Sequence, residues 1–195
     1  MTTFYLIRHG ATDAIGQSFT GRLPGVSLNT EGRQQAQALA ASFPKVPLAG
    51  LYASPSDRAQ ETAAALSAAV QRPVQCDPHF DEIHIGDWSG RTFEELNEFA
   101  GFRDFNSHRS LSRPPGGEMM LEVQSRVVSR LLQLAATHPE SHVAVVTHAD
   151  VIKAALAYFV GIPLDLTHRL EIGLCSMSIV RLACDYVQVV AINRS

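Results

Sequence analysis

The chain has 195 residues and is poor in the features that mark secreted, membrane-spanning or nucleic-acid-binding proteins. Its three cysteines, Cys76, Cys175 and Cys184, are odd in number and widely spaced, which predicts reduced thiols and neither a disulfide framework nor a zinc site. The net charge is only −3, so neither a nucleic acid nor an anionic membrane is indicated as a partner. No apolar run is long enough to span a bilayer, and the first residues lack the basic segment and cleavage site of a signal peptide. We therefore expect a cytoplasmic protein.

The sequence also lacks the glycine-rich phosphate loop of nucleotide-hydrolysing enzymes and the Cys/His spacing of metal sites. Neither nucleotide-driven chemistry nor a metal or other cofactor is therefore expected. Surface or capping positions are expected for the histidines that fit no metal pattern, which are His79, His108, His138, His142 and His168. The length suits one domain, residues 1–195, with a sizeable core.

The most informative stretch is a short apolar strand, about residues 3–8, that leads into Arg8, His9 and Gly10. Ligands bind at the carboxyl ends of strands in α/β proteins. The arginine side chain is a rigid fork of donors that matches phosphate oxygens, and imidazole is a nucleophile near neutral pH. Gly10 would let the backbone turn sharply and approach a ligand closely. The alternative is a histidine that ends a strand beside an arginine paired with a surface acid.

Two later strands end in residues of the same kind. One strand covers about residues 49–54 and is followed by a helix, for which Ser54 is the expected N-cap and Pro55 the first helical residue. Arg58 would then lie in the first turn, near the positive end of the helix dipole, where an anion is favoured. Another hydrophobic strand leads directly to His148. Three strands should therefore deliver these groups to one edge of a sheet.

These segments resemble the motifs of the histidine phosphatase superfamily, also called the phosphoglycerate mutase-like fold. The motifs occur in family order between residue 4 and about residue 155: Arg-His-Gly at 8–10, Ser-Pro-x-x-Arg-Ala-x-x-Thr-Ala at 54–63, Glu-Ile-x-x-Gly-x-Trp-x-Gly at 82–90 and Thr-His at 147–148.

The resemblance implies roles for five residues. It implies that His9 becomes a covalent phosphohistidine and that Glu82 is the proton donor. It also implies that Arg8, Arg58 and His148 hold the phosphoryl group. A carboxyl group with an ordinary pKa of ~4.3 would need that pKa raised to serve as the acid, or would have to act through the phosphate's own proton.

Several positions that line the pocket rim in this family differ here, so the substrate stays open. Ala11 and Ile15 stand where many members carry Glu and Asn, and His84 stands where an acid is common. The Gln-Gly pair of many members appears as Thr20-Gly21, and a common Gly-Gly pair appears as Ala149-Asp150. Substrate contacts are expected from Thr20, Gly21, Arg22 and Ala149.

Strands and helices alternate along the chain, which predicts a doubly wound α/β fold with a mostly parallel sheet, helices on both faces and an antiparallel edge. The remaining strands are expected at about residues 74–76, 143–147, 176–183 and 186–192, the last two pairing around Cys184 and Asp185. Helices are expected at about 30–43, after the N-cap Asn29, from Pro55 through Arg58 to about 70, at 118–137, and from the turn at His148 to near Gly161.

Residues 84–117 are too long and irregular for a simple connection, so a helical cap insertion over the site is expected. Phenylalanines alternate there with Arg103, Arg109 and Arg113, whose roles the sequence leaves open, as it does that of His84. A satellite packing unit is the alternative, and both descriptions can hold at once.

The function we expect is a metal-independent phosphatase that acts on a small phosphorylated metabolite. A phosphoglycerate mutase is the first alternative, although mutases of this family tend to be longer. A phosphohistidine-protein phosphatase would need a more open site, and a non-catalytic phospholigand-binding protein would not need the intact motif residues. The sequence does not distinguish among α-ribazole phosphate, sugar phosphates and phosphoglycerates as substrates. The oligomeric state is also open, a homodimer being one option.

Overall fold

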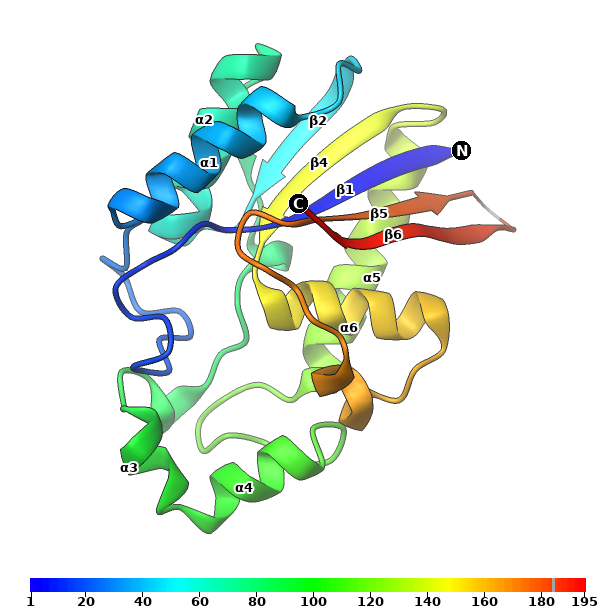
Figure 1. Ribbon diagram of the computed structural model, residues 1–195. Helices are drawn as coiled ribbons and strands as arrows, with labels where there is room; N and C mark the ends of the chain where they lie inside the picture. The colour runs from blue at the N-terminus through cyan, green and yellow to red at the C-terminus, as the bar shows by residue number, and fades with distance from the viewer. Residues whose placement is uncertain (184) are drawn as a thin grey trace.

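The structure is a computed structural model, and it describes residues 1–183 and 185–195, apart from the side chain of Ala100. Its centre is a six-stranded sheet with the order β3-β2-β4-β1-β5-β6 (Figure 1). The strands are β1 (Thr2–Arg8), β2 (Leu48–Ala53), β3 (Val74–Cys76), β4 (His142–Thr147), β5 (Met177–Leu182) and β6 (Val187–Arg194). The first four strands pair in parallel, whereas β5 pairs antiparallel with both β1 and β6.

The predicted mostly parallel sheet with an antiparallel edge is therefore confirmed. Strands β5 and β6 pair with each other as expected. Cys184, around which they were expected to turn, lies outside the described residues.

Helices cover both faces of the sheet, as in a doubly wound fold. Helices α1 (Thr30–Ser42) and α2 (Asp57–Val70) pack on one face, and α5 (Met120–Thr137) and α6 (Ala149–Val160) pack on the other (Figure 1). Because side chains alternate along a strand, Phe4 and Leu6 of β1 join the core under α5 and α6, while Tyr5 and Ile7 join the core under α1 and α2. The central strands are thus buried on both faces.

Of the two helix N-caps that the sequence predicted, one is confirmed and the other is wrong. Asn29 caps α1 as expected, its side chain accepting a hydrogen bond from the Gly32 N–H at 2.8 Å. The prediction for α2 is wrong, because the helix begins at Asp57 and its N-cap residue is Ser56. Ser54 is instead fully buried and hydrogen-bonded inside the site described below. Arg58 does lie in the first turn of α2.

The carboxyl ends of β1, β2 and β4 lie side by side in the parallel part of the sheet. Arg8 stands opposite Thr147, and the residues just beyond continue the pairing. The His9 N–H donates to the Thr147 carbonyl at 3.0 Å, and the Ser54 N–H donates to the Val146 carbonyl at 3.0 Å. The residues that leave these three strands are therefore held at one edge of the sheet, as the sequence predicted.

Residues 84–117, here called the cap segment, form the short helices η2 (Gly86–Trp88), α3 (Phe93–Asn97) and α4 (Ala100–Ser107). In Figure 1 they lie beyond the end of the sheet at which β1, β2 and β4 finish. Trp88 packs edge-on against Phe102 and Phe105, with ring centroids 5.5 Å apart in each pair. These three side chains belong to the same buried hydrophobic cluster as Met120 and Val123 of α5, so the segment extends the core on this face of the sheet.

Backbone and charged contacts tie the cap segment to the rest of the molecule. The Phe19 N–H donates to the Arg91 carbonyl and the Phe19 carbonyl accepts from the Gly90 N–H, each at 2.9 Å. Arg109 pairs with Asp150 of α6 at 2.8 Å. Arg113 likewise binds the Glu122 carboxylate through two nitrogens, whereas Arg103 and His84 are exposed. Two further 3₁₀ helices are η1 (Pro78–Phe80) and η3 (Leu164–Arg169), and no described helix has the length and apolar character needed to cross a membrane.

Candidate active site

His9 follows β1 and is almost completely buried. Its Nδ1 atom lies 2.8 Å from the Gly10 carbonyl, an acceptor, so we place the ring proton on Nδ1 and the free electron pair on Nε2. Burial, followed by the charge of Arg58, lowers the pKa of His9 to about 3. The imidazole is therefore neutral at physiological pH and presents Nε2 as a nucleophile.

The sequence predicted that Gly10 would let the backbone approach a ligand. In the structure, the backbone at Gly10 instead lies close to α1, so a glycine is required there for packing. A Cβ atom at Gly10 would lie 2.6 Å from the Gly32 carbonyl oxygen. The Gly10 N–H donates to the Thr62 hydroxyl at 3.1 Å, and that hydroxyl donates to the Arg58 carbonyl at 2.7 Å. The strand that carries His9 is thus held against the helix that carries Arg58.

The guanidinium of Arg58 lies at the centre of the cluster. Its Nε donates to His9 Nε2 at 3.3 Å, and its Nη2 donates to the Gly21 carbonyl at 2.8 Å and to His148 Nδ1 at 3.3 Å. Its Nη1 is buried and has no hydrogen-bond partner among the described residues.

Arg8 also keeps a free donor beside this cluster. Its Nη1 donates to the Ile172 carbonyl at 2.6 Å, whereas its buried Nε has no partner in the described part of the chain. Both arginines line the same cavity of about 150 Å³. Buried donors of charged groups are costly to leave unsatisfied, so the cavity is suited to an anion that accepts from both.

His148 follows β4 as the N-cap residue of α6 and is fully buried, with its ring centroid 5.2 Å from that of His9. Its Nδ1 accepts from Arg58, so we place the ring proton on Nε2, which lies 2.8 Å from the Ser54 hydroxyl. Burial lowers the pKa of His148 well below its usual range, and the charges of nearby side chains lower it further. In this structure His148 is therefore a neutral ring oriented by Ser54.

Glu82 brings a carboxyl group to the same cluster. Its Oε2 lies 3.5 Å from His148 Nδ1, and its Oε1 accepts from the Ile83 N–H at 3.0 Å. Burial raises the pKa of Glu82 to about 7, with the charge of Asp150 adding to the rise. A carboxyl group with this pKa can both release and take up a proton near neutral pH.

The neighbouring acid, Asp81, is engaged in structural hydrogen bonds. Its Oδ1 accepts from the Ser54 hydroxyl at 3.0 Å and from the Glu82 N–H at 2.9 Å, while its Oδ2 faces Arg22 at 3.4 Å. Of the two adjacent carboxylates, Glu82 is the one that lines the cavity.

The four expected substrate contacts separate into two groups. Thr20 and Gly21 line the cavity. Arg22 is not among the lining residues, and its guanidinium binds the Glu118 carboxylate at 2.9 Å and the Glu82 carbonyl at 2.7 Å. Ala149 lines a different cavity, which shares only Arg8 with the first.

Two parts of the site escaped sequence reasoning. Ser54 was assigned to a helix cap, although its place in the Ser-Pro motif was a signal that it belonged to the site. The rim position of Ile15 and the cap segment that holds Phe93 were expected near the site, but no sequence signal indicated that these residues and Phe19 together form an apolar wall of the cavity. Among the described residues, no group of three or more His, Cys, Asp or Glu side chains is arranged to hold a metal ion.

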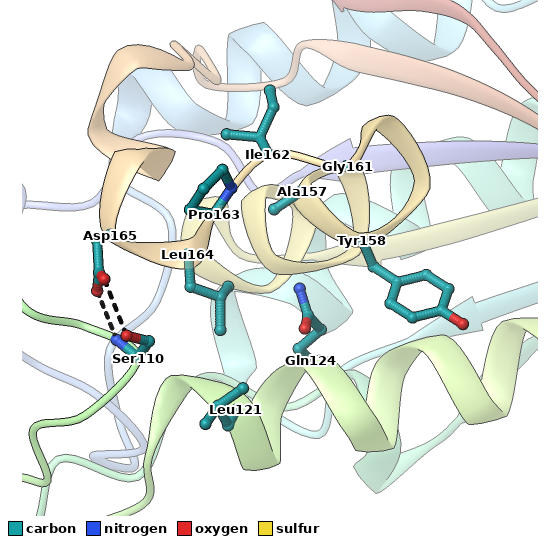
Figure 2. Close-up of a pocket in the computed structure, with 10 residues that line it drawn as sticks. All are labelled: Ser110, Leu121, Gln124, Ala157, Tyr158, Gly161, Ile162, Pro163, Leu164 and Asp165. Carbon is teal, nitrogen blue, oxygen red and sulfur yellow. Dashed lines mark hydrogen bonds between the residues drawn. The ribbon is translucent and has the colours of Figure 1, made fainter.

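A second hollow of about 420 Å³ lies between α5, α6 and η3, and Figure 2 shows its lining. The lining is largely apolar, with Leu121, Ile162 and Leu164 among its members. At its rim the Asp165 carboxylate accepts from the Ser110 N–H and hydroxyl at 2.8 and 2.9 Å (Figure 2). None of the clustered residues lines this hollow, so it is separate from the candidate site.

Comparison with known proteins gives a consistent result. The family model for the histidine phosphatase superfamily (branch 1) matches residues 4–195. A solved structure of Bacillus stearothermophilus YhfR superposes with a TM-score of 0.94 at 31% identity and covers 100% of this chain and 98% of its own. Glucosyl-3-phosphoglycerate phosphatase of Mycolicibacterium vanbaalenii is 31% identical over 82% of this chain and 75% of its own. Phosphoglycerate mutase-like protein 4 of Arabidopsis thaliana is 32% identical over 76% of this chain and 67% of its own.

Proposed function

The chain belongs to branch 1 of the histidine phosphatase superfamily, as a phosphoric monoester hydrolase of that type, and from this membership we propose that it hydrolyses a small phosphomonoester through a covalent phosphohistidine at His9. One observation carries the proposal. Arg8 Nε and Arg58 Nη1 are buried guanidinium donors with no partner in the described structure, and both arginines line the cavity beside a neutral histidine. A phosphoryl group beside His9 would give both donors an acceptor.

In the first step, Nε2 of His9 attacks phosphorus and the bond from phosphorus to the ester oxygen breaks. The ring proton is on Nδ1 and faces the Gly10 carbonyl, so Nε2 attacks without prior deprotonation, and the hydrogen bond that it accepts from Arg58 Nε at 3.3 Å is given up to the phosphoryl group. Glu82, whose pKa is raised to about 7, delivers its proton to the departing alkoxide. The products of this step are the alcohol, a phosphohistidine and the Glu82 carboxylate.

In the second step, the Glu82 carboxylate takes a proton from water and the water oxygen attacks phosphorus. The bond from phosphorus to Nε2 breaks, inorganic phosphate leaves, and both His9 and Glu82 return to their starting states. One carboxyl group can serve as acid and then as base because its pKa lies near neutral pH.

The side chains of the site can supply the charge that phosphoryl transfer needs. The arginines are fixed by the carbonyls of Ile172 and Gly21, so their remaining donors are oriented before the substrate arrives. Charge-assisted hydrogen bonds contribute ~1.5–3 kcal/mol each, and more in a preorganised site shielded from water. We therefore propose that the reaction needs no metal ion.

The cavity also limits the leaving group. Its volume is about 150 Å³, and beyond the arginines its wall is formed by Ile15, Phe19 and Phe93 together with small and hydroxyl side chains. An alcohol that is compact and apolar where it meets this wall fits better than a protein side chain does. We propose a small-molecule phosphomonoester as the substrate.

The test is to trap the intermediate in the presence of EDTA. The protein is mixed with p-nitrophenyl phosphate, quenched in base and digested, and the peptide that contains His9 is analysed by mass spectrometry. We expect an acid-labile, base-stable phosphate on His9 and a burst of p-nitrophenol. A phosphate-free His9 peptide from actively hydrolysing protein would refute the covalent mechanism, and activity that returns only with added metal would refute metal independence.

A further inference from the structure

A larger cavity adjoins the candidate site on the side of α6. Its volume is about 550 Å³, and Arg8 is the lining residue that it shares with the catalytic cavity. Part of its lining comes from α6, with Ala149 and Lys153 one helical turn apart, and part from residues 168–173. We call it the α6 cavity.

The lining of the α6 cavity is strongly basic. Arg8, Lys153, Arg169 and His168 face it, against the single carboxylate of Glu171. No ion pair joins Lys153 or Arg169 to a carboxylate within the described residues, although most other arginines near this edge are paired. Lys153 is half-buried, and burial lowers the pKa of its ammonium although the charges of Asp150 and Glu171 act in the opposite direction, so its lost hydration is only partly compensated.

The wall of the α6 cavity is attached directly to Arg8. The Ile172 carbonyl accepts from Arg8 Nη1 at 2.6 Å, and the Cys175 N–H donates to the Arg8 carbonyl at 3.1 Å. The cavity also includes the first residue of the 12-residue helix α6, where backbone N–H groups and the helix dipole favour negative charge. Side-chain charge, helix dipole and an arginine shared with the catalytic cavity all act in the same direction.

We infer that the α6 cavity binds an anionic group, a phosphate or a carboxylate, of a small molecule. The group could belong to a separate anion or be a second acidic group on the substrate, and the chemistry of recognition is the same in both cases. Lys153 and Arg169 would neutralise it, and its charge would also act on Arg8. The substrate version rests on the proposed function, whereas the binding site itself does not.

The first experiment is an NMR titration of the whole protein with inorganic phosphate. The amides of Gly173 and His168 report on the α6 cavity, and those of Thr12 and Gly21 report on the catalytic cavity. We expect two saturation curves with different dissociation constants. In Lys153→Gln, the curve from Gly173 should weaken by roughly tenfold, the loss of one charge-assisted contact, while the curve from Gly21 stays unchanged.

The chain offers a matched control, because its two lysines are Lys45 and Lys153. Lys45 is exposed and follows α1, far from this cavity in the sequence and in the fold, so Lys45→Gln removes the same charge without touching the site. If Gly173 and Gly21 report one common dissociation constant that Lys153→Gln does not change, the inference is wrong. A missing curve at Gly21 with an intact one at Gly173 would refute the proposed function and leave this inference standing.

The second experiment separates the two sources of the anion. Glycerol 3-phosphate and 3-phosphoglycerate are phosphomonoesters of similar size, and only the second carries a carboxylate. If the α6 cavity binds the carboxylate of the substrate, the wild-type protein should prefer 3-phosphoglycerate by roughly tenfold in kcat/KM, and Lys153→Gln should lose this preference. Equal kcat/KM values, with the NMR curve at Gly173 intact, would assign the cavity to a separate anion.

Discussion

The Nε2 atom of His148 lies 2.8 Å from the Oγ atom of Ser54, and both side chains are fully buried. The Ser54 hydroxyl in turn donates to the Asp81 carboxylate at 3.0 Å. This chain of hydrogen bonds holds the proton of His148 on the side away from Arg58 and directs Nδ1 toward the guanidinium and Glu82. Ser54 therefore orients His148, and Asp81 holds the backbone of Glu82, although neither Ser54 nor Asp81 lines the cavity.

Ser54→Ala should lower both stability and activity. The change leaves the buried N–H of His148 without its nearest acceptor, which costs about 1–3 kcal/mol. We expect urea unfolding to show a loss in this range and kcat/KM for p-nitrophenyl phosphate to fall. Ser56→Ala is the control, because the Ser56 hydroxyl lies 3.4 Å from the same nitrogen, and its effect should be much smaller. Equal losses in the two variants would remove the orienting role from Ser54.

His9→Ala should abolish turnover and leave the fold intact. The imidazole forms the proposed covalent bond, and no other imidazole or thiol is among the described residues that line the cavity. Circular dichroism and urea unfolding check the fold, and release of inorganic phosphate checks the activity. His108→Ala, which removes an exposed histidine from the cap segment, should keep full activity. Turnover by His9→Ala at the wild-type rate would rule out the mechanism.

Glu82→Gln should slow the reaction to an extent that depends on the leaving group. An alkyl phosphate releases a poor alkoxide leaving group, so losing the acid should cost ~10²–10⁴ in rate, whereas p-nitrophenolate needs little help. The comparison uses burst rates, because Glu82 is also the proposed base of the second step. Asp81→Asn is the matched variant and should lack this dependence on the leaving group. If instead Asp81→Asn shows the dependence and Glu82→Gln does not, the acid is Asp81.

The burst rate should fall as pH rises through about 7, because Glu82 must carry a proton in the first step. The negative charge of Asp150 contributes to the raised pKa of Glu82, so Asp150→Asn should lower that pKa. The high-pH limb of the burst-rate profile should therefore move to lower pH. Glu140→Gln removes an equal charge at the opposite end of β4 and should leave the limb in place. A limb that does not move in Asp150→Asn would show that another group controls it.

Gly10→Ala should destabilise the protein through packing. The new Cβ would lie 2.6 Å from the Gly32 carbonyl oxygen, and neither backbone segment can yield easily. Overpacking of this kind costs roughly 1–3 kcal/mol, which urea unfolding can measure. Gly101→Ala on α4 is the control, since its nearest contact would be an ordinary 3.9 Å to the Trp88 ring. Equal stability of the two variants would show that the segment around Gly10 can shift at little cost.

Sequence reasoning was sufficient for the sheet and for the main members of the candidate site. Hydrophobic strands that each end in a charged or imidazole side chain predict a common edge, because parallel strands in one sheet place their carboxyl ends together. The structure brings His9, Arg58 and His148 together at that edge, with contacts of 3.3 Å that no local pattern could supply.

Sequence alone determined which residues leave the strand ends, because strand periodicity and turn residues are local properties. It could not determine what each side chain meets there. Ser54 was misread because a serine before a proline suits a helix cap by local energetics, whereas the buried His148 nitrogen, 94 positions away, is the partner it binds. The raised pKa of Glu82, the commitment of Arg22 to Glu118 and the basic lining of the α6 cavity likewise depend on burial and on charges from distant segments. Burial and long-range charge arise only when the chain has folded, so the tertiary structure alone decided them.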